Sequence, residues 1–403
     1  MGWCLQIAPW TTDRRWLVQA EGLETAGDQA LKLGQVRDAW DAYSRAGEAY
    51  RFGCFCEHAD RLHSLAESLT ERGSVPWSIN SLRWAAVDGL RGNPLKSLER
   101  LKDVKEQTLT VNTLAVLTDS RIGYLLMAGM REEAERLLQV LKSSQSASSQ
   151  LSLRFRSAEL LILDGRFNQC MSLIDSLEHE LGALDPEGTG AYALQMMRAD
   201  IFMTLKDWSA AHEVLSGVAA YYRRTYRVDA WLRCSAYLAR VSVRMGQEVQ
   251  EEPLAKGQIY ALEKGLLPLA CSLDLAMGVI AAEIDRDGAT ENFRRAWRLA
   301  DTLGLSSLAR LARWLWVDRC GWSEEGHKEL LHGRTLSGLS EPMHARMEWL
   351  IVCHSTDLKG AGWYKDAIHL YGRFTDMEMS ADAQAVREFL VAAGYPDPKD
   401  EKG

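Results

Sequence analysis

The sequence has no excess of positive charge and no long apolar run free of interruptions. Its 403 residues include 47 Lys and Arg against 55 Asp and Glu, which gives a formal net charge of −8. General binding to nucleic acid needs a basic surface that replaces phosphate counterions, so this balance argues against it. The longest apolar stretch, residues 265–282, contains Pro268 and Asp274. Because a carboxylate is costly to bury in lipid, we expect a buried helix there rather than a membrane span.

Paired cysteine motifs are also absent. The chain has eight Cys and no Cys-x-x-Cys pair, which argues against a disulfide framework and favours a reducing compartment. Residues 1–10 lack the basic end followed by a long apolar run that is typical of a secretory signal. We therefore expect a cytoplasmic protein.

Signatures of sheets and of common catalytic sites are missing as well. No segment alternates apolar and polar residues with an enrichment in β-branched side chains, so we expect no sheet. The sequence contains no phosphate-binding Gly-x4-Gly-Lys-Ser/Thr loop and no Gly-x-Gly-x-x-Gly turn. It also lacks the His-Glu-x-x-His and Gly-x-Ser-x-Gly motifs of hydrolases. We expect neither enzymatic activity nor a bound cofactor or metal ion.

Two clusters of reactive residue types have structural roles as alternatives. The first contains four possible zinc ligands: Cys54, Cys56, His58 and His63. Free Cys is more often a small buried hydrophobe, and two residues spaced by two on a helix point about 200° apart. The second contains the residue types of a Cys-His protease: His332, Cys353 and His354. The usual scaffold of such proteases contains a sheet, which this sequence does not predict.

One spacing pattern recurs along the chain. A Gly is followed after five residues by a small or apolar residue, after nine by a large apolar residue and after twelve by another apolar or small residue. Lys206 replaces the Gly in one window, and Gly246 opens a weaker copy. The starting positions are Gly34, Gly92, Gly129, Gly165, Lys206, Gly246, Gly288 and Gly362. Between Gly92 and Gly288 the windows repeat every 36 to 42 residues, the range of stacked helical hairpins.

The pattern has a direct physical reading. The Gly ends one helix by adopting the left-handed conformation, and the three later positions share one face of the next helix. A second column lies seven residues before each starting position. It consists of Gly27, Ala85, Ile122, Ala158, Ala199, Ala239, Ala281 and Ser355. All but Ile122 are small, which lets the two helices of a hairpin approach closely.

These paired columns resemble the tetratricopeptide repeat (TPR). The long, loose period is similar to the divergent repeats in the sensor domain of maltose-type bacterial transcription regulators, and residues 297–305 have the same character. The resemblance extends over about residues 20–374. It lacks the proline that TPR units carry after the second helix, and residues 320–340 fit the register poorly.

The resemblance implies an all-α, right-handed superhelical solenoid of stacked helical hairpins. We expect the chain to divide into four segments. These are an N-terminal cap at residues 1–19, the repeat array at 20–375, a capping helix at 376–394 and a disordered tail at 395–403.

In the TPR family the first helix of each hairpin lines the concave surface. Six residues before three successive starting positions lie Glu159, Asp200 and Arg240, and three residues before them lie Ile162, Met203 and Val243. A strip of charge beside a strip of apolar residues suits an extended or helical peptide. The predicted contact residues for a partner protein or peptide are Glu159, Asp200, Met203, Arg233 and Arg240. The alternative is a solvated helix face whose charges pair within the protein.

The predicted function is a protein-interaction scaffold or adaptor that binds a partner polypeptide in the concave groove. The alternative is a ligand-sensing regulator, in which a small molecule or peptide in the groove modulates a partner. Such sensors usually adjoin an ATPase and a DNA-binding domain, and this chain has neither a phosphate loop nor a basic helix-turn-helix. The Lys, Asn and Arg set with which TPR proteins clamp C-terminal carboxylates is not found here.

Overall fold

The computed structural model describes residues 15–143, 147–184, 189–225, 227–283, 286–336, 338, 340–354 and 361–398. Over these residues the chain forms twenty α-helices, one short 3-10 helix and no strand. The prediction of an all-α array is therefore confirmed. The helices are α1 (Arg15–Lys32), α2 (Val36–Phe52), α3 (Cys56–Ser68), α4 (Val75–Leu90), α5 (Pro94–Leu101), η2 (Glu106–Thr108), α6 (Val111–Met127), α7 (Arg131–Ser143), α8 (Ala147–Leu163), α9 (Phe167–Leu184), α10 (Thr189–Leu205), α11 (Trp208–Arg224), α12 (Val228–Arg244), α13 (Glu252–Glu263), α14 (Leu267–Ala281), α15 (Arg286–Thr302), α16 (Ser306–Cys320), α17 (Glu324–Thr335), α18 (Glu341–Cys353), α19 (Ala361–Asp376) and α20 (Ser380–Ala392).

Tight left-handed turns join the two helices of most hairpins. Five of the starting glycines adopt positive φ at these turns: Gly34, Gly92, Gly129, Gly165 and Gly246. Lys206 takes the same conformation with φ +63° between α10 and α11, although a side chain makes it less favourable by about 1–2 kcal/mol. The sequence pattern therefore identified the turn correctly even where no glycine is present.

Two starting positions are placed wrongly by the pattern. Gly288 lies in the first turn of α15, and Gly362 is the second residue of α19. Neither is a turn residue. The positions that follow Gly288 are nevertheless buried, with Phe293 and Trp297 both inside the core. The apolar positions of the pattern thus predicted the buried face of α15 correctly. Burial depends on which face of the helix packs inward and not on where the helix begins.

The column of small residues lies where paired helices touch. Ala85, Ala158 and Ala199 are completely buried, and a Cβ atom at Gly27 would lie 2.7 Å from the ring of Tyr43. Ala281 is only half-buried, because it is the last residue of α14. Ser355 lies outside the described residues. Close helix packing therefore explains the column, most clearly in the middle of the helices.

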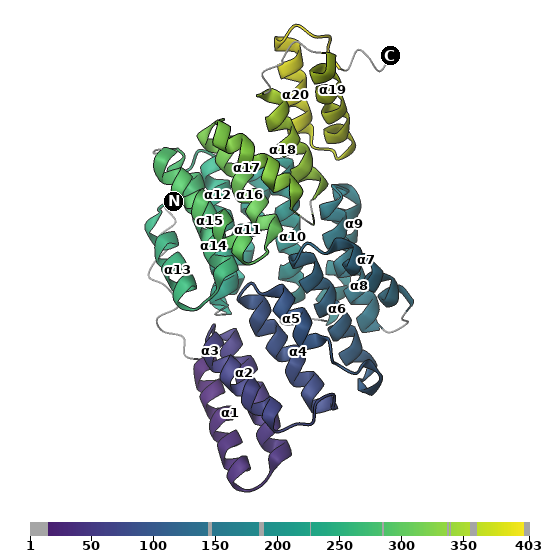
Figure 1. Cartoon of the computed structure of the whole chain (residues 1–403), viewed down its shortest axis with the longest axis vertical. Helices are drawn as coiled ribbons and strands as arrows, with labels where there is room; N and C mark the ends of the chain where they lie inside the picture. The colour runs from purple at the N-terminus through teal and green to yellow at the C-terminus, as the bar shows by residue number, and fades with distance from the viewer. Residues whose placement is uncertain are drawn as a thin grey trace.

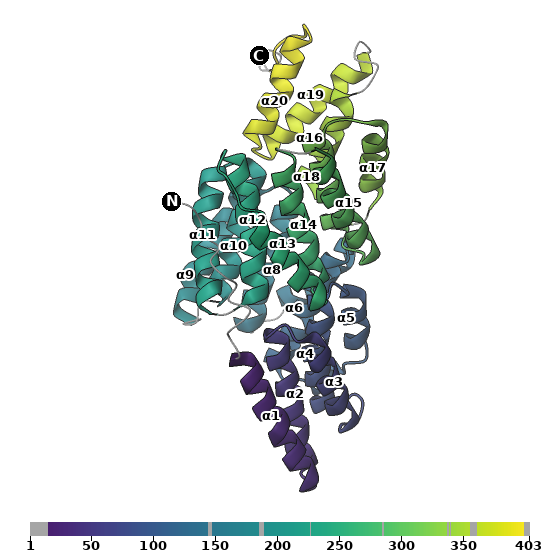
Figure 2. The ribbon, with the colours of Figure 1, turned by 90° about the vertical axis from the view of Figure 1, so that its left-hand side faces the viewer.

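The helices form two layers. The even-numbered helices contact one another in the orders α2–α4–α6–α8 and α12–α14–α16–α18, and the odd-numbered helices pack outside them. In both views the array is elongated, with α1–α3 at one end and α19 and α20 at the other (Figures 1 and 2). Helix α14 contacts α12, α13, α15 and α16, and every residue from Leu269 to Ile280 is buried. Within the described residues, no helix is long and apolar enough to cross a membrane.

Successive turns of the superhelix also touch one another. Asn168 Nδ2 donates a hydrogen bond to Glu378 Oε1 over 2.7 Å, between residues 210 positions apart. A Cβ atom at Gly338 would lie 2.5 Å from Gly129 Cα, so two backbones meet directly there. One hydrophobic cluster joins residues of α1–α4 to residues of α10–α14. These contacts close the superhelix on itself.

A buried ion-pair network, which we call the inter-turn clasp, ties two of these turns together. Asp382 of α20 binds Lys206 at 2.9 Å and Arg346 of α18 at 2.7 Å. Arg346 also donates a hydrogen bond to the backbone oxygen of Thr204 at the end of α10. Burial raises the pKa of Asp382, but Arg346 and Lys206 outweigh burial and hold the pKa below its usual value.

Both ends of the described chain contact neighbouring helices. Helix α1 begins at Arg15 and packs on α2, so part of the expected cap at residues 1–19 belongs to the first hairpin. At the other end, Tyr395 stacks on Tyr364 with ring centroids 4.6 Å apart, and Asp397 pairs with Arg387 at 2.5 Å. Residues 395 and 397 thus contact α19 and α20, and the predicted division of the chain into four segments stays a prediction. Residues 1–14 and 399–403 lie outside the described residues.

The small-residue column leads to a stability prediction. Ala199→Trp should lower the free energy of unfolding by about 1–3 kcal/mol or more, because it overpacks a completely buried contact. Ala281→Trp should cost less, since Ala281 is half-buried. Ala220→Trp on the exposed face of α11 is the matched control and should be nearly neutral. Urea denaturation of the three variants measures the effects, and equal losses in all three would contradict the helix register.

The inter-turn clasp leads to a second prediction. Asp382→Asn leaves the buried Arg346 and the half-buried Lys206 without their shared counterion and should cost about 3–5 kcal/mol at neutral pH. Since the folded-state pKa of Asp382 is lowered, the stabilisation exists above the unfolded pKa and is lost as the pH falls through the folded value. Urea denaturation between pH 7 and pH 3 tests both statements. The exposed pair of Glu324 with Lys328 offers the control, because Glu324→Gln should leave stability almost unchanged.

Candidate ligand-binding cavity

The inner layer of helices lines a partly open cavity of about 400 Å³. Its wall comes from α8, α10, α12, α14, α16 and α18, with Lys206 added from the turn after α10 and Trp208 from the start of α11. This volume falls within the range of about 300–1,000 Å³ that is typical of ligand pockets. The apolar part of the wall consists of Ile162, Leu163, Met203, Val241, Val279, Leu311, Leu315 and Met343.

Three of the five predicted contact residues line this cavity. Asp200 and Met203 project from α10, and Arg240 projects from α12. Arg233 is exposed and is not among the lining residues, although its charge lowers the pKa of Asp200. Glu159 is also absent from the wall. It pairs with Arg156 at 2.8 Å. For Glu159, therefore, the alternative of a charge that pairs within the protein is the one present.

Asp200 and Arg240 are two charged groups without a direct partner. Among the described residues, neither the Asp200 carboxylate nor the Arg240 guanidinium makes a hydrogen bond or an ion pair. Burial raises the pKa of Asp200 to about 6, although Arg240 and Arg233 lower it. Burial likewise lowers the pKa of Arg240, against the effects of Tyr237 and Asp200. The cavity therefore holds charges that the protein itself stabilises poorly.

Aromatic rings lie under three of the cations in the wall. The Arg240 guanidinium carbon is 5.6 Å from the ring centroid of Tyr237, and that of Arg244 is 5.7 Å from Trp208. Arg346 approaches Trp314 at 5.3 Å. An aromatic ring below a guanidinium fixes the plane of the group and leaves its N–H donors directed sideways.

Arg310 of α16 also lines the cavity. Arg310 donates hydrogen bonds to the backbone oxygens of Leu336 and Gly338 over 2.7 and 2.6 Å. These acceptors are neutral, and burial lowers the pKa of Arg310 to about 10. In total, five cationic side chains and two carboxylates line the cavity, namely Lys206, Arg240, Arg244, Arg310 and Arg346 against Asp200 and Asp318. The wall is thus basic, in a chain whose net charge is −8.

The sequence contains a signal for part of the wall outside the predicted windows. Gly321 adopts φ +95° after α16 and is the true turn residue of that hairpin. The same spacing rule, applied to Gly321, selects Leu315 and Asp318, and both line the cavity. The predicted repeat register leaves out this window, because residues 320–340 fit the spacing pattern poorly. Arg310, Trp314 and Arg346 follow no shared spacing and could not be found in that way.

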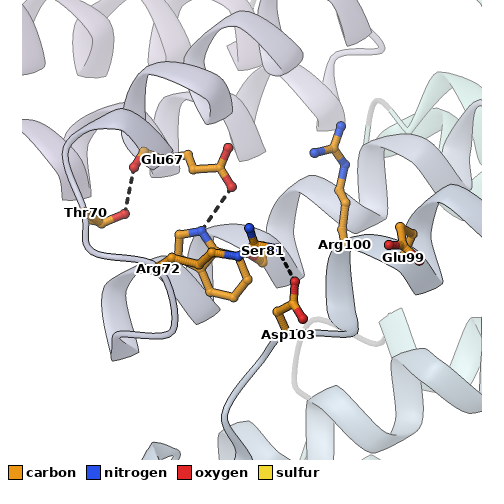
Figure 3. Close-up of a pocket in the computed structure, with 8 residues that line it drawn as sticks. Glu67, Thr70, Arg72, Ser81, Glu99, Arg100 and Asp103 are labelled. Atoms are coloured by element: carbon orange, nitrogen blue, oxygen red, sulfur yellow. Dashed lines mark hydrogen bonds and ion pairs between the residues drawn. The ribbon is translucent and has the colours of Figure 1, made fainter.

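A second pocket of about 320 Å³ lies between α3, α4 and α5 (Figure 3). Its polar groups satisfy one another: Trp77 Nε1 donates to Glu67 at 3.0 Å, and Arg72 pairs with Asp103. Arg100 binds Asp88, and its guanidinium lies over the ring of Trp84. This pocket is a less suitable ligand site, because its charges are already paired.

The clusters weighed as zinc or protease sites have structural roles. Within the described residues, no group of three or more His, Cys, Asp and Glu could hold a metal ion. His63 is buried, lies 2.9 Å from Asn80 Oδ1, and its pKa is lowered to about 4 by burial. Burial raises the pKa of the Cys353 thiol to about 12, which opposes formation of the nucleophilic thiolate. His354 stacks on Trp322 at 4.6 Å.

Comparison with solved structures identifies similar folds. The structure of a Rap protein complexed with competence and sporulation factor matches with a TM-score of 0.57 and 11% identity, covering 77% of this chain and 91% of that chain. This chain has a TPR-like fold. At 11% identity the likeness concerns the fold alone. The sequence matches no protein-family model and no curated protein.

Two weaker matches cover more of this chain. Yeast Tom70 matches with a TM-score of 0.35 and 12% identity, covering 93% of this chain and 95% of that chain. The Cut9–Hcn1 heterotetramer of APC/C matches with a TM-score of 0.30 and 13% identity, covering 94% and 85%. The finer resemblance to maltose-type regulators stays a prediction.

The raised pKa of Asp200 leads to a third prediction. Above pH 6 the ionised carboxylate destabilises the folded state, so Asp200→Asn should raise Tm by about 1–3 °C at pH 7.5. Below pH 6 the folded protein takes up a proton at Asp200, and this gain in stability is lost as the pH rises through 6. The advantage of the variant should therefore shrink at pH 5. Thermal unfolding at both pH values measures the effect.

Asp318→Asn is the matched control for this experiment. Asp318 also lines the cavity, but it pairs with Arg244 at 2.7 Å. Its replacement should lower Tm at pH 7.5, because Arg244 loses its counterion. If Asp200→Asn lowers Tm as well, the Asp200 carboxylate has a stabilising partner and the description of the cavity is wrong.

Proposed function

We propose that the chain is a scaffold or adaptor that binds a polypeptide segment of a partner protein in the cavity inside the solenoid. The observation that carries the proposal is the presence of unpaired Asp200 and Arg240 in a partly apolar wall. Charged groups that cost stability without a partner are typical of binding sites, where a ligand supplies the missing interactions.

The composition of the wall supports a peptide as the occupant. A peptide offers carbonyl and amide groups along its backbone and carries both apolar and charged side chains. The wall provides the matching surfaces in Met203, Leu311 and Met343 for apolar groups and in Asp200 and Arg240 for polar ones. A cavity lined by several inner helices suits a peptide segment. The fold also supports the proposal, since the Rap protein of the same fold was solved in complex with competence and sporulation factor.

A ligand-sensing role is the second candidate, and one residue favours it. Arg346 lines the cavity and also belongs to the inter-turn clasp with Asp382. A small molecule that binds Arg346 would compete with Asp382 and change the contact between turns. Mass spectrometry of the denatured purified protein tests this role, because a sensor of this kind should release a stoichiometric metabolite.

The cysteines support the proposal of a reducing, cytoplasmic environment. All seven cysteines within the described residues are free thiols, and most of them are buried. A chain folded in an oxidising compartment would be expected to use some of them in disulfides.

A cavity-filling variant tests the proposed function. Met203→Trp places a large ring in the cavity and should reduce the affinity for peptides selected from a random heptapeptide library by about tenfold or more. Ala220→Trp adds the same ring on the outer helix α11 and should leave affinity unchanged. Isothermal titration calorimetry with both variants measures the effect, after thermal unfolding has shown that each is folded. Peptides that bind Met203→Trp as tightly as the parent would place the binding surface outside the cavity.

A further inference from the structure

The charges around the cavity do not cancel. Arg244 is neutralised by Asp318 at 2.7 Å. Lys206 and Arg346 share the single carboxylate of Asp382 behind the wall. Two cations on one carboxylate leave a surplus of positive charge beside the cavity, and charge enclosed by protein is costly unless it is compensated.

Arg240 is the cation best placed to act on a ligand. It lines the cavity, makes no ion pair or hydrogen bond with a described residue, and lies over the ring of Tyr237 at 5.6 Å from its centroid. The groups that act on it electrostatically are Tyr237 and Arg244 from its own helix and Asp200 from α10. Asp200 is not within ion-pair distance, so the N–H donors of Arg240 remain available for an acceptor.

We propose that the cavity selects acidic peptide segments, and that Arg240 binds a side-chain carboxylate of the peptide through its paired N–H donors. The inference rests on the proposed function and adds the chemical class of the peptide. A guanidinium presents donors in a fork that matches the two oxygens of a carboxylate, and such bidentate bonds are among the strongest in proteins.

The part of the wall that α16 and α18 contribute fits the remainder of such a segment. Leu311, Trp314 and Met343 offer an apolar surface on α16 and α18, and the Trp314 ring also carries Arg346 at 5.3 Å. An apolar side chain next to the acidic residue packs on this surface while the carboxylate faces Arg240. A basic peptide would instead bring positive charge into a wall that already has a surplus of it.

The test uses synthetic heptapeptide pools with acetylated and amidated ends. One pool has Asp or Glu fixed at the central position, a second has Asn or Gln, and a third has Lys. Because the ends carry no charge, a preference among the pools comes from the central side chain. Binding of each pool to the full chain, measured by fluorescence polarisation, should favour the acidic pool over the amide pool by about tenfold.

Variants of Arg240 assign the preference to this residue. Arg240→Gln should abolish most of the preference for the acidic pool, and Arg240→Lys should keep only part of it, because an ammonium lacks the fork. Arg136→Gln is the control on the outer helix α7, where Arg136 pairs with Glu133 and is 71% exposed. Raising salt from about 50 to about 500 mM should weaken binding of the acidic pool most.

Several outcomes would overturn the inference. Equal binding of the acidic and amide pools, or an acidic preference that survives in Arg240→Gln, contradicts it. Competition by inorganic phosphate as effective as by the acidic pool would identify a free anion rather than a peptide as the ligand. If the pools bind and Met203→Trp blocks them without any acidic preference, the inference fails while the proposed function stands. If Met203→Trp blocks no pool, the proposed function fails.

Discussion

The contact between successive turns of the superhelix is the constraint on which the rest of the molecule depends. In a helical repeat array each hairpin packs on its neighbours, and nothing in that local packing requires distant hairpins to meet. Here Asp382 holds cations from two different turns, and the backbones of Gly129 and Gly338 touch. The inner layer therefore lines a partly open cavity. Burial there, in turn, is what changes the pKa values of Asp200 and Arg240.

The hairpins could be predicted from the sequence because their determinants are local. The left-handed turn at Gly165, the buried small side chain at Ala158 and the conformation of Lys206 all follow from residues a few positions apart. The same reasoning gave the inner-face register that brings Asp200 and Arg240 into one cavity. Near Gly288 the turn between α14 and α15 contains no glycine, so the spacing pattern took a glycine inside α15 as the turn residue.

The features that the sequence did not predict depend on contacts between distant parts of the chain. No local spacing relates Arg346 to Asp382, or Arg310 to the backbone oxygens after α17. The pairing of Glu159 with Arg156, and the anchoring of Tyr395 on Tyr364, also depend on which side chains happen to lie opposite in the folded molecule. For this reason the sequence predicted which helix faces point inward, but not which of their charges are paired.

Lys206 shows how a local and a distant requirement meet in one residue. A glycine would make the turn after α10 more easily, but it has no ammonium group to reach Asp382. The turn of the α10 and α11 hairpin is set by its own residues, and its packing partners α9 and α12 are its neighbours in the chain, so these contacts become available early in synthesis. Its tie to α20 cannot form until residue 382 has been synthesised. During translation the array therefore passes through a stage in which its hairpins are complete and its central cavity is still open to the surroundings.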